Sequence, residues 1–511
     1  MMSNNIGEGG FLYPLIYQQS KDYVTKKFQE GNIDHIDSST WGFTDNFFAY
    51  LLQTKFFEFV DKSYPTPRDK TEVPIWFLIS CQLAMRLSLK NAYSSLSELM
   101  LMSGPILFRV GFNIGSKQLG FNDKNKNPRK IPISDSTALK FFKDTNVQAI
   151  RDWYNIDVQG WFKRHRYFDA NGIYVLDQTH CVVPDNPNYE DAVKMPVDEH
   201  GQRYKGLDNM TKEQKKALKY HNCYALSFLL HISAQKNSFH IAGYEWGPGN
   251  EDELPQGKKI IANFIKAHEK GTIRLLIMDR GYLSGEYITE LKKVYEIDVL
   301  IPLKENMQQY QDAIALSKMA ETEWEEENEI DENTEEVLSK TKACKINDIS
   351  LWDECKVKLQ TIVVEKTTFN GKTKNWETNA WVLATTKVFR SAMDGARSYN
   401  LRVQIEERNK QLKISWKLSQ FSSPNKSLIE AQVCFILLTY SMIQAFLMRK
   451  DLQELANKTI VSLRGEEAMG QNSVVTYADD KFAVYNTKEV LGIVNQLPTK
   501  EVREKIQKVL K

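Results

Sequence analysis

The chain has 511 residues, of which 42% are hydrophobic and 26% are charged, and its formal net charge is +2. A chain of this length and composition buries a large core and divides into two to four structural units. The near balance of charge excludes a uniformly basic, histone-like binder, although it is compatible with a local basic groove. Its six cysteines are scattered, with no C-x-x-C pair and no histidine pair at ligand spacing, so we expect reduced thiols in an intracellular protein rather than a zinc site or disulfides.

No segment predicts insertion into a membrane. Residues 1–10 lack a basic region followed by an apolar one, so they do not resemble a secretion signal. The run from Leu428 to Met448 approaches the length of a bilayer span but contains Glu430, Gln432 and Gln444. We interpret it as a long buried helix that covers a sheet, and we expect a cytoplasmic protein without a membrane partner.

The first 165 residues predict a mainly helical domain. A helical pattern runs from Glu72 to Leu107, and a second helix begins near Asp135 or Ser136. Between them, residues 116–130 are polar and basic, as expected of an exposed loop. Two helices joined by a basic loop could bind DNA ends or could serve packing, and the sequence leaves both open.

From Asn171 the pattern becomes β-rich. In GIYVLDQTHCVV, Asp177 interrupts an apolar run, which is costly unless the acid is paired, and a divalent cation is one such partner. The alternative is an acid that caps a turn at the end of a strand. After a polar, Lys-rich excursion (184–219), the segments HNCYALSFLLHIS and SFHIAGYEW predict two further strands, hence a meander.

A helix with Ile260 and Phe264 on one face follows, and then a β-α-β unit. Its first strand, Leu275 to Met278, ends at Asp279, and the carboxyl ends of such strands are where open α/β sheets bind ligands. Asp279 is therefore the second candidate carboxylate, with helix capping as the alternative.

Residues 305–385 predict a β-rich insertion. Its acidic segment, Glu321 to Glu336, reads as solvated, and the strands 356–365 and 376–385 flank Asn370-Gly371 as a hairpin. Beyond it, residues 399–417 contain neither Pro nor Gly and predict one amphipathic helix. On this helix Tyr399, Arg402, Glu406 and Lys413 share one face, which suits a metal and a phosphate; an ordinary solvated face is the alternative.

The spacing Y-x2-R-x3-E-x6-K resembles the Y-R-E-K signature of DDE transposases in the bacterial insertion-sequence family numbered four. The D-R-G-Y run from Asp279 and, more loosely, D-Q-T-H around Asp177 resemble the same family. The resemblance implies that Asp177, Asp279 and Glu406 are catalytic and hold the metal. It also implies that Tyr399, Arg402 and Lys413 bind DNA phosphates, and Arg280 could do likewise. In that family an aromatic residue of the insertion stacks on an extruded base, for which Trp352, Trp376 and Trp381 are candidates here.

Three carboxylates that meet in space repel one another, and two Mg²⁺ ions, or Mn²⁺ as a substitute, would supply the counter-charge. Paired ions activate water or a 3′-hydroxyl for phosphoryl transfer. The resemblance implies an endonuclease that cuts and pastes its own element through a hairpin intermediate. The implied partners are terminal inverted repeats, target double-stranded DNA and a second copy of the chain, in the cytoplasm at the bacterial nucleoid.

We therefore expect an α/β protein with an RNase H-like mixed sheet flanked by helices. The predicted domains are a mainly helical domain that could bind DNA ends (1–165), a catalytic domain (166–304 with 386–450), the β insertion (305–385) and a helical tail (451–511). The tail would dimerise, touch DNA or cap the domain. The alternatives are a nuclease of the same fold and a domesticated DNA-binding protein that does not transpose.

Overall fold

The computed structural model describes residues 20–69, 73–96, 99, 133–202, 204, 207, 210–233, 236–330, 337–347, 349–370, 374–465, 471–479, 481–497 and 499–509. The predicted basic loop at 116–130 lies outside these residues. The chain divides into two compact units, Tyr154–Lys413 and a second made of Met1–Trp153 with Ile414–Lys511. We describe each unit by itself.

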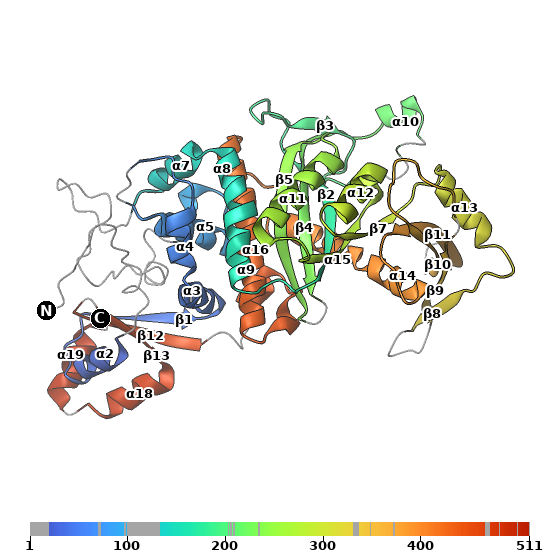
Figure 1. Cartoon of the computed structure of the whole chain (residues 1–511). Coiled ribbons are helices and arrows are strands. Elements are labelled where there is room, and N and C mark those ends of the chain that lie inside the picture. The colour runs from blue at the N-terminus through green and yellow to red at the C-terminus, as the bar shows by residue number, and fades with distance from the viewer. Residues whose placement is uncertain are drawn as a thin grey trace. The chain divides into compact units, whose positions relative to one another are not determined.

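A ten-stranded mixed sheet organises the unit Tyr154–Lys413 (Figure 1), with the strands in the order β3-β4-β2-β6-β7-β11-β10-β9-β8 and β5 paired to β4. The predicted meander is confirmed, because β2 pairs antiparallel with β4 and β4 with β5. Parallel pairing joins β2 to β6 and β6 to β7, as the β-α-β pattern predicts. The strands are β2 (Gly172–Val182), β3 (Val193–Met195), β4 (His221–Ser233), β5 (Ser238–Pro248), β6 (Ile273–Met278), β7 (Asp298–Pro302), β8 (Glu325–Ile330), β9 (Val337–Ile346), β10 (Gln360–Asn370) and β11 (Asn375–Thr385).

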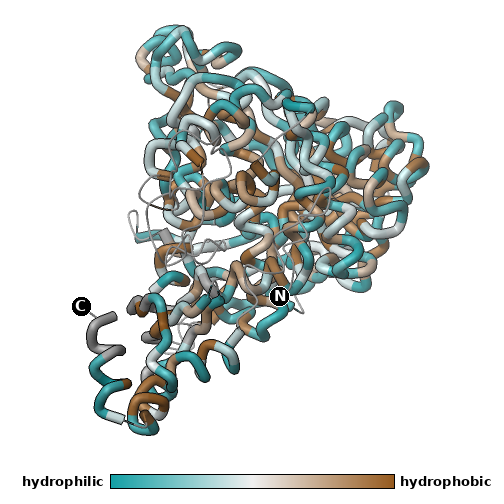
Figure 2. Tube along the Cα trace, turned by 90° about the vertical axis from the view of Figure 1, so that its left-hand side faces the viewer, coloured by the Kyte–Doolittle hydropathy of each residue, from teal (hydrophilic) through white to brown (hydrophobic). Residues whose placement is uncertain are grey.

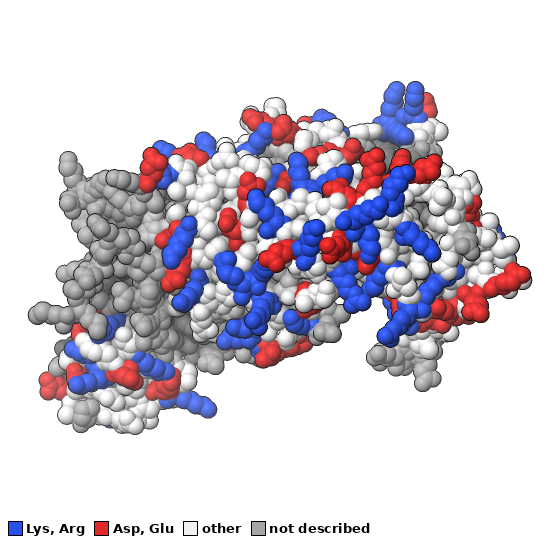
Figure 3. All heavy atoms as spheres, viewed as in Figure 1, with Lys and Arg blue, Asp and Glu red and all other residues white. Residues whose placement is uncertain are grey.

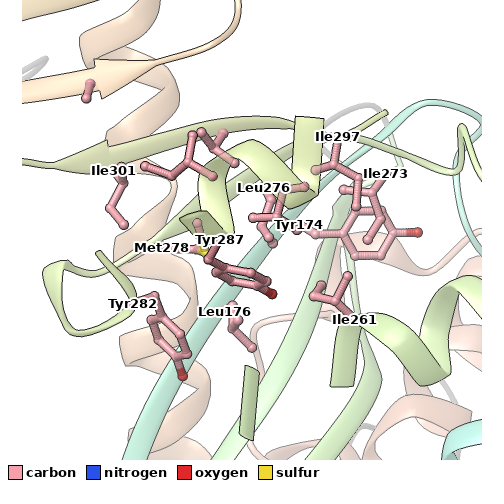
Figure 4. Close-up of a cluster of buried hydrophobic side chains, with 14 of the residues drawn as sticks. Tyr174, Leu176, Ile261, Ile273, Leu276, Met278, Tyr282, Tyr287, Ile297 and Ile301 are labelled. Carbon is pink, nitrogen blue, oxygen red and sulfur yellow. The ribbon is translucent and has the colours of Figure 1, made fainter. Parts of the chain in front are cut away.

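The core of this unit lies between the sheet and two helices, α11 (Glu253–His268) and α12 (Gly285–Lys293). Alternate residues of β2 point into it, so Tyr174 and Leu176 are buried there, together with Met278 at the end of β6 (Figure 4). Helix α11 packs closely, because a Cβ on Gly257 would lie 2.7 Å from the Tyr282 ring. The middle of β2, which carries Asp177, and the end of β6, which precedes Asp279, therefore lie against a closely packed core. The mixed sheet flanked by helices confirms the predicted RNase H-like fold class.

The β-rich segment expected at 305–385 continues the ten-stranded sheet, because β11 pairs antiparallel with β7. Its hairpin, β10 with β11, is confirmed. The acidic segment differs from the expectation of a merely solvated stretch, since its residues 325–330 form the edge strand β8. Glu326 pairs with Lys342 and Glu327 with Arg397, so the strand's negative charges have local cationic partners.

The helix predicted over 399–417 is interrupted. Helix α14 (Ala392–Asn400) ends before Leu401, and α15 (Arg402–Ile414) begins after it, although neither Pro nor Gly stands at the break. Helix α14 is anchored elsewhere: Glu325 accepts hydrogen bonds from the backbone N–H groups of Ala392 and Met393, and a Cβ on Gly395 would lie 2.2 Å from Ile362. Tertiary packing therefore sets the direction of α14, and Tyr399 does not share a helix with Glu406.

The remaining helices of this unit connect the strands. They are α9 (Gln159–Arg164), α10 (Lys212–Lys216), the 3₁₀ turn η5 (Arg280–Tyr282) and α13 (Gln308–Leu316); a π-helical segment, Trp153–Val158, precedes α9. The segment between β2 and β4 contains α10, which has no buried residue. Thr211 and Gln214 form a capping box at the N-terminus of α10.

The other unit is mainly helical around α16 (Lys426–Arg449). Helix α16 contacts α3, α5, α7 and α8 of its own unit. We expected it to cover the sheet, whereas the division of the chain assigns it to this helical unit. The unit's other helices are α2 (Lys21–Gln29), α3 (Phe43–Gln53), α4 (Phe56–Ser63), α5 (Ile75–Leu87), η1 (Tyr93–Ser95), α7 (Asp135–Asp144), α8 (Val147–Asp152), η6 (Gln453–Leu455), α17 (Ile460–Arg464), α18 (Thr487–Asn495) and α19 (Lys500–Val509).

By length and apolar composition α16 could span a bilayer, but 94% of its most apolar window is buried within the protein. Its buried Glu430 receives two hydrogen bonds from the guanidinium of Arg151. Figure 2 shows hydrophobic and hydrophilic residues alternating along the described trace, as expected where one face of an element is buried and the other exposed.

A small sheet joins an N-terminal and a C-terminal segment of the described chain. Strand β1 (His35–Trp41) pairs with β12 (Gln471–Ala478), which pairs with β13 (Lys481–Asn486). Val24 and Phe28 of α2 pack with Tyr485 and Ile493 in a common core. The segment 451–511, expected to be helical, therefore also supplies two strands.

Candidate active site

Asp177 lies in β2 directly after Leu176 and faces the side of the sheet opposite the α11 core. There the side-chain amide of Asn409, on α15, lies 3.3 Å from its Oδ2 and donates a hydrogen bond to it. The Asp177 side chain is half-buried. Burial raises its pKa to about 7; nearby Arg402 opposes this, and the negative charges of Asp279 and Glu253 add to it. Asp177 is therefore a carboxyl that gains from a nearby cation.

Asp279 occupies the carboxyl end of β6, beside β2. Its Oδ1 accepts a hydrogen bond of 2.7 Å from the backbone N–H of Arg280, so it caps the 3₁₀ turn that follows. Its Oδ2 lies 3.8 Å from Nη1 of Arg402. Asp279 therefore caps the turn through Oδ1, as one interpretation predicted, and its Oδ2 also faces Arg402, as expected of a site residue.

Arg402 connects the carboxylates. Its Nη2 lies 2.5 Å from Oε1 of Glu406, one helical turn along α15, while Nη1 faces Asp279. The Arg402 side chain is 23% exposed and that of Glu406 is 50% exposed. Burial acts to lower the pKa of the guanidinium, but the surrounding groups Asp279, Tyr399, Asp177 and Glu406 together raise it. All three predicted acids therefore interact electrostatically with one cation.

Tyr399 lies in the last turn of α14, and its phenol is beside this group. Burial raises the pKa of the Tyr399 phenol to about 12. The charge of Arg402 acts to lower this pKa, and the charges of Asp279 and Asp177 act to raise it. The prediction that Tyr399 shares a helix face with Arg402 is wrong, whereas its proximity to Arg402 does not depend on that helix.

Lys413, at the other end of α15, is engaged with the protein. Its ammonium lies 3.0 Å from the backbone carbonyl oxygen of His200, to which it donates a hydrogen bond. Burial lowers its pKa, and Asp198 and Asp177 act in the opposite direction. Lys413 thus ties α15 to the turn 198–202 of the excursion between β2 and β4. Arg280, by contrast, is exposed and forms no ion pair within the described part of the chain.

Two residues near the site were not predicted. Asn409 lies three residues after Glu406 on α15, a spacing that places both on neighbouring positions of one helix face and could have indicated it. Glu253, at the start of α11, has its carboxylate oxygen 1.7 Å from where a Cβ of Gly281 would lie. No local pattern marks Glu253, because only the packing of α11 against the Asp279 turn brings it there.

The three candidate tryptophans differ in exposure. Trp352 packs against the core of the catalytic sheet, and Trp381 is half-buried. Trp376 is 47% exposed, and its ring forms an edge contact with Phe369 across the hairpin, 5.7 Å between centroids. The ammonium of Lys340 lies 5.9 Å from the centre of the Trp376 ring. Trp376 is thus the exposed one of the three.

The residues present fit a hard divalent cation in chemistry, since they offer carboxylate oxygens and already attract a guanidinium. Their positions fit less closely. In the described ranges, no three Asp, Glu, His or Cys side chains lie close enough together to ligate one ion.

Positive side chains are also prominent on the surface of this unit. Figure 3 shows Lys and Arg spheres gathered over the region that carries α12 and α14, interleaved with acidic ones, and again at α10. The lysines of α10 are Lys212, Lys215 and Lys216. Such side chains can contact phosphates without reading base sequence.

A model of the transposase DDE domain matches residues 160–442, more than half of the chain. A comparison with curated proteins found no match. The matched range contains Asp177, Asp279, Glu406, Arg402 and Lys413. Enzymes with this domain act on DNA and generally use divalent metal ions. The chain therefore belongs to the family of transposases with a DDE domain.

Proposed function

We propose that this protein is a cut-and-paste transposase that cleaves DNA at the ends of an insertion sequence and joins the 3′ ends to target DNA. Asp177, Asp279 and Glu406 are its catalytic carboxylates and metal ligands. The observation that carries this proposal is their common interaction with Arg402, since residues from two strands and a helix converge on one cation.

In this mechanism two Mg²⁺ ions, or Mn²⁺ in their place, would supply Lewis-acid activation of the attacking oxygen and stabilise the leaving oxygen. Asp177 must be ionised to serve as a ligand, so its raised pKa makes the site sensitive to pH near neutrality. Asn409 orients the Asp177 carboxylate by its hydrogen bond. The turn after β6 orients Asp279 through the N–H of Arg280.

The cations around the carboxylates position the DNA strand. Arg402 has a planar guanidinium that suits a phosphate, and Tyr399 lies beside it. Lys413 holds the excursion between β2 and β4 against α15, and Arg280 is exposed at the turn after Asp279. We assign all four to binding of the DNA backbone, Lys413 in part through the loop that it holds.

The finer assignment rests on the Y-R-E-K spacing of Tyr399, Arg402, Glu406 and Lys413. This spacing supports membership of the insertion-sequence family numbered four and a hairpin intermediate at the transposon end. Trp376 is then the residue we assign to stacking on an extruded base, because its ring is exposed at the hairpin.

The proposed partners are the terminal inverted repeats, target double-stranded DNA and a second copy of the chain. Residues 1–165 would contribute to binding of the DNA ends, and the segment 451–511 to dimerisation or DNA contact. The protein would act in the bacterial cytoplasm at the nucleoid. A nuclease of the same fold would share the carboxylates but would have no preference for the element's own ends.

The test is cleavage of duplexes that carry the inverted repeats flanking the gene, compared with duplexes in which those repeats are scrambled. We expect nicking of the matched ends only, dependent on Mg²⁺ or Mn²⁺. Asp177→Ala, Asp279→Ala and Glu406→Ala should each reduce cleavage by about 10³-fold or more, since each removes several kcal/mol of stabilisation of the transition state. Binding of the ends, measured by gel shift, should persist.

Metal-dependent cleavage that survives one of these substitutions would remove that residue from the catalytic set. Equal cleavage of matched and scrambled duplexes would favour the nuclease. Binding without cleavage by the unaltered protein would favour the domesticated DNA-binding protein.

A further inference from the structure

We infer that Arg402 couples DNA binding to metal binding: its guanidinium occupies Asp279 and Glu406 in the DNA-free protein, and an incoming phosphate draws it away and releases both carboxylates for the metal. The inference rests on the proposed function and adds a regulatory step to the same site.

The first support is geometric. Nη2 of Arg402 lies 2.5 Å from Glu406, while Nη1 lies 3.8 Å from Asp279, so the two nitrogens face different carboxylates. These acids belong to α15 and to the end of β6. The guanidinium is therefore placed where a cation shared by the two acids is needed, and a divalent ion would compete for the same oxygens.

The second support is the arrangement of the acids themselves. No three acidic, histidine or cysteine side chains in the described residues are close enough to hold one ion. The carboxylates thus have to approach one another before they chelate, and they cannot do so while Arg402 stands between Asp279 and Glu406. Removal of this cation leaves uncompensated negative charge, which favours binding of a divalent ion.

The third support concerns the position of Arg402. Its side chain is partly exposed, at 23%, so a ligand in solution can reach it. Guanidinium groups bind phosphate with two parallel hydrogen bonds, and a DNA strand offers phosphates at every nucleotide. Arg402 can therefore exchange a carboxylate partner for a phosphate partner.

Linkage makes the consequence measurable. If DNA raises metal affinity by some factor, metal raises DNA affinity by the same factor. The protein would hold metal weakly when it is free and strongly when DNA is bound. Cleavage competence would then be assembled on the DNA substrate.

The experiment measures Mn²⁺ binding to the full chain by calorimetry, with and without a duplex that ends at the tip of the terminal repeat and so has no bond left to cleave there. For the unaltered protein we expect Mn²⁺ affinity to rise about 10-fold when the duplex is bound. In Arg402→Gln the affinity of the DNA-free protein should rise about 5-fold, and the effect of DNA should fall below about 2-fold. Arg402→Lys, which keeps the charge but not the planar group, should be intermediate.

Two controls make the result specific. Lys410→Gln removes an exposed cation of the same helix and should keep the full effect of DNA. Asp279→Asn should bind Mn²⁺ weakly in both states, which shows that the signal comes from this site. Melting temperatures of all variants identify any that fail to fold, in which case Arg402→Lys carries the test.

Weaker Mn²⁺ binding by DNA-free Arg402→Gln, or an unchanged effect of DNA, would overturn the coupling. The proposed function would survive either result, provided that Mn²⁺ still binds and Asp279→Asn still abolishes binding. Failure of the unaltered protein to bind Mn²⁺ in either state would instead overturn both proposals.

Discussion

Two very different groups of polar residues lie near the opposite ends of helix α11. At one end, Glu253 begins α11 near Asp177, and carboxylates surround Arg402. At the other end, His268 closes α11, and His231 and His240 lie on β4 and β5. The first group is charged and reaches solvent, whereas the second is buried.

The histidine end is built from stacked rings. His268 lies parallel to Phe264 at 4.3 Å between centroids, and His231 lies 5.0 Å from the ring of Tyr174. Among the described residues, Nε2 of His268 and both ring nitrogens of His240 have no hydrogen-bond partner. Burial lowers the pKa of His240 and of His268 to about 3, so both are neutral.

The difference indicates that the histidine end contributes mainly to stability and the carboxylate end mainly to chemistry. At the histidine end His240 and His268 are neutral, because dense packing removes the water that would stabilise a charged imidazole. At the carboxylate end the acids lie beside the guanidinium of Arg402. Burying charged groups lowers the free energy of unfolding, and binding of metal and DNA to the folded protein would raise it again. Substitutions at the two ends should therefore affect different properties.

The largest expected effect is on stability at the histidine end. Phe264→Ala should lower the free energy of unfolding by about 3–5 kcal/mol, because it removes a fully buried ring that packs on Phe168, Tyr174 and His268. Chemical denaturation measures the change. Val294→Ala, an exposed apolar truncation on the same unit, is the matched control and should cost less than about 0.5 kcal/mol. A cost for Phe264→Ala as small as that of the control would refute the packed character of this end.

The next effect depends on pH. His268 has a folded-state pKa below that of the unfolded chain, because burial and, to a lesser extent, Lys163 and His231 disfavour its charge. The unfolded chain therefore takes up the proton first, and stability that is present above pH 6.5 is lost as the pH falls towards 3. His268→Phe keeps the stacking and should remove about 2 kcal/mol of the loss between pH 6.5 and 5. Unfolding curves at both pH values test this, and an unchanged pH dependence would contradict it.

The smallest effect has the opposite sign and concerns the carboxylate end. Asp177 has a folded-state pKa of about 7, raised by burial, so the native protein retains a proton that the unfolded chain releases. The associated stability is present at acidic pH and is lost as the pH rises through 7. Asp177→Asn cannot ionise, so without metal it should melt about 3 °C higher than the unaltered protein at pH 8. The difference should be smaller at pH 5, because the unfolded Asp177 carboxyl begins to ionise above its ordinary pKa of about 4 and the penalty is complete only above pH 7. A lower melting temperature at pH 8 would show that the Asp177 charge stabilises the fold.

Much of this fold could be predicted from local patterns. The apolar runs before Asp177 and Asp279 placed the first acid within a strand and the second directly after one, because such runs form strands wherever both faces are covered. The β-α-β unit and the hairpin between β10 and β11 were predictable for the same reason. The edge strand β8 was not, since its acidic residues have low strand propensity and are held by Lys342 and Arg397 from elsewhere in the chain.

The sequence predicted which residues form the candidate site better than it predicted the contacts between them. The spacing of Arg402 and Glu406 indicated their ion pair, which is local to α15. The break at Leu401 had no local signal and follows from the anchoring of α14 by Glu325 and Gly395. The hydrogen bond of Lys413 to His200 joins residues distant in the chain, so spacing could not reveal it.

What the sequence by itself determined is which side chains are available and on which kind of element each stands, because periodicity and strand propensity act over a few residues. Only the tertiary structure decided that Asp279 and Glu406 share Arg402, and that Asn409 reaches Asp177. Such contacts depend on how β2, β6 and α15 pack, which is set by buried surface contributed from the whole domain.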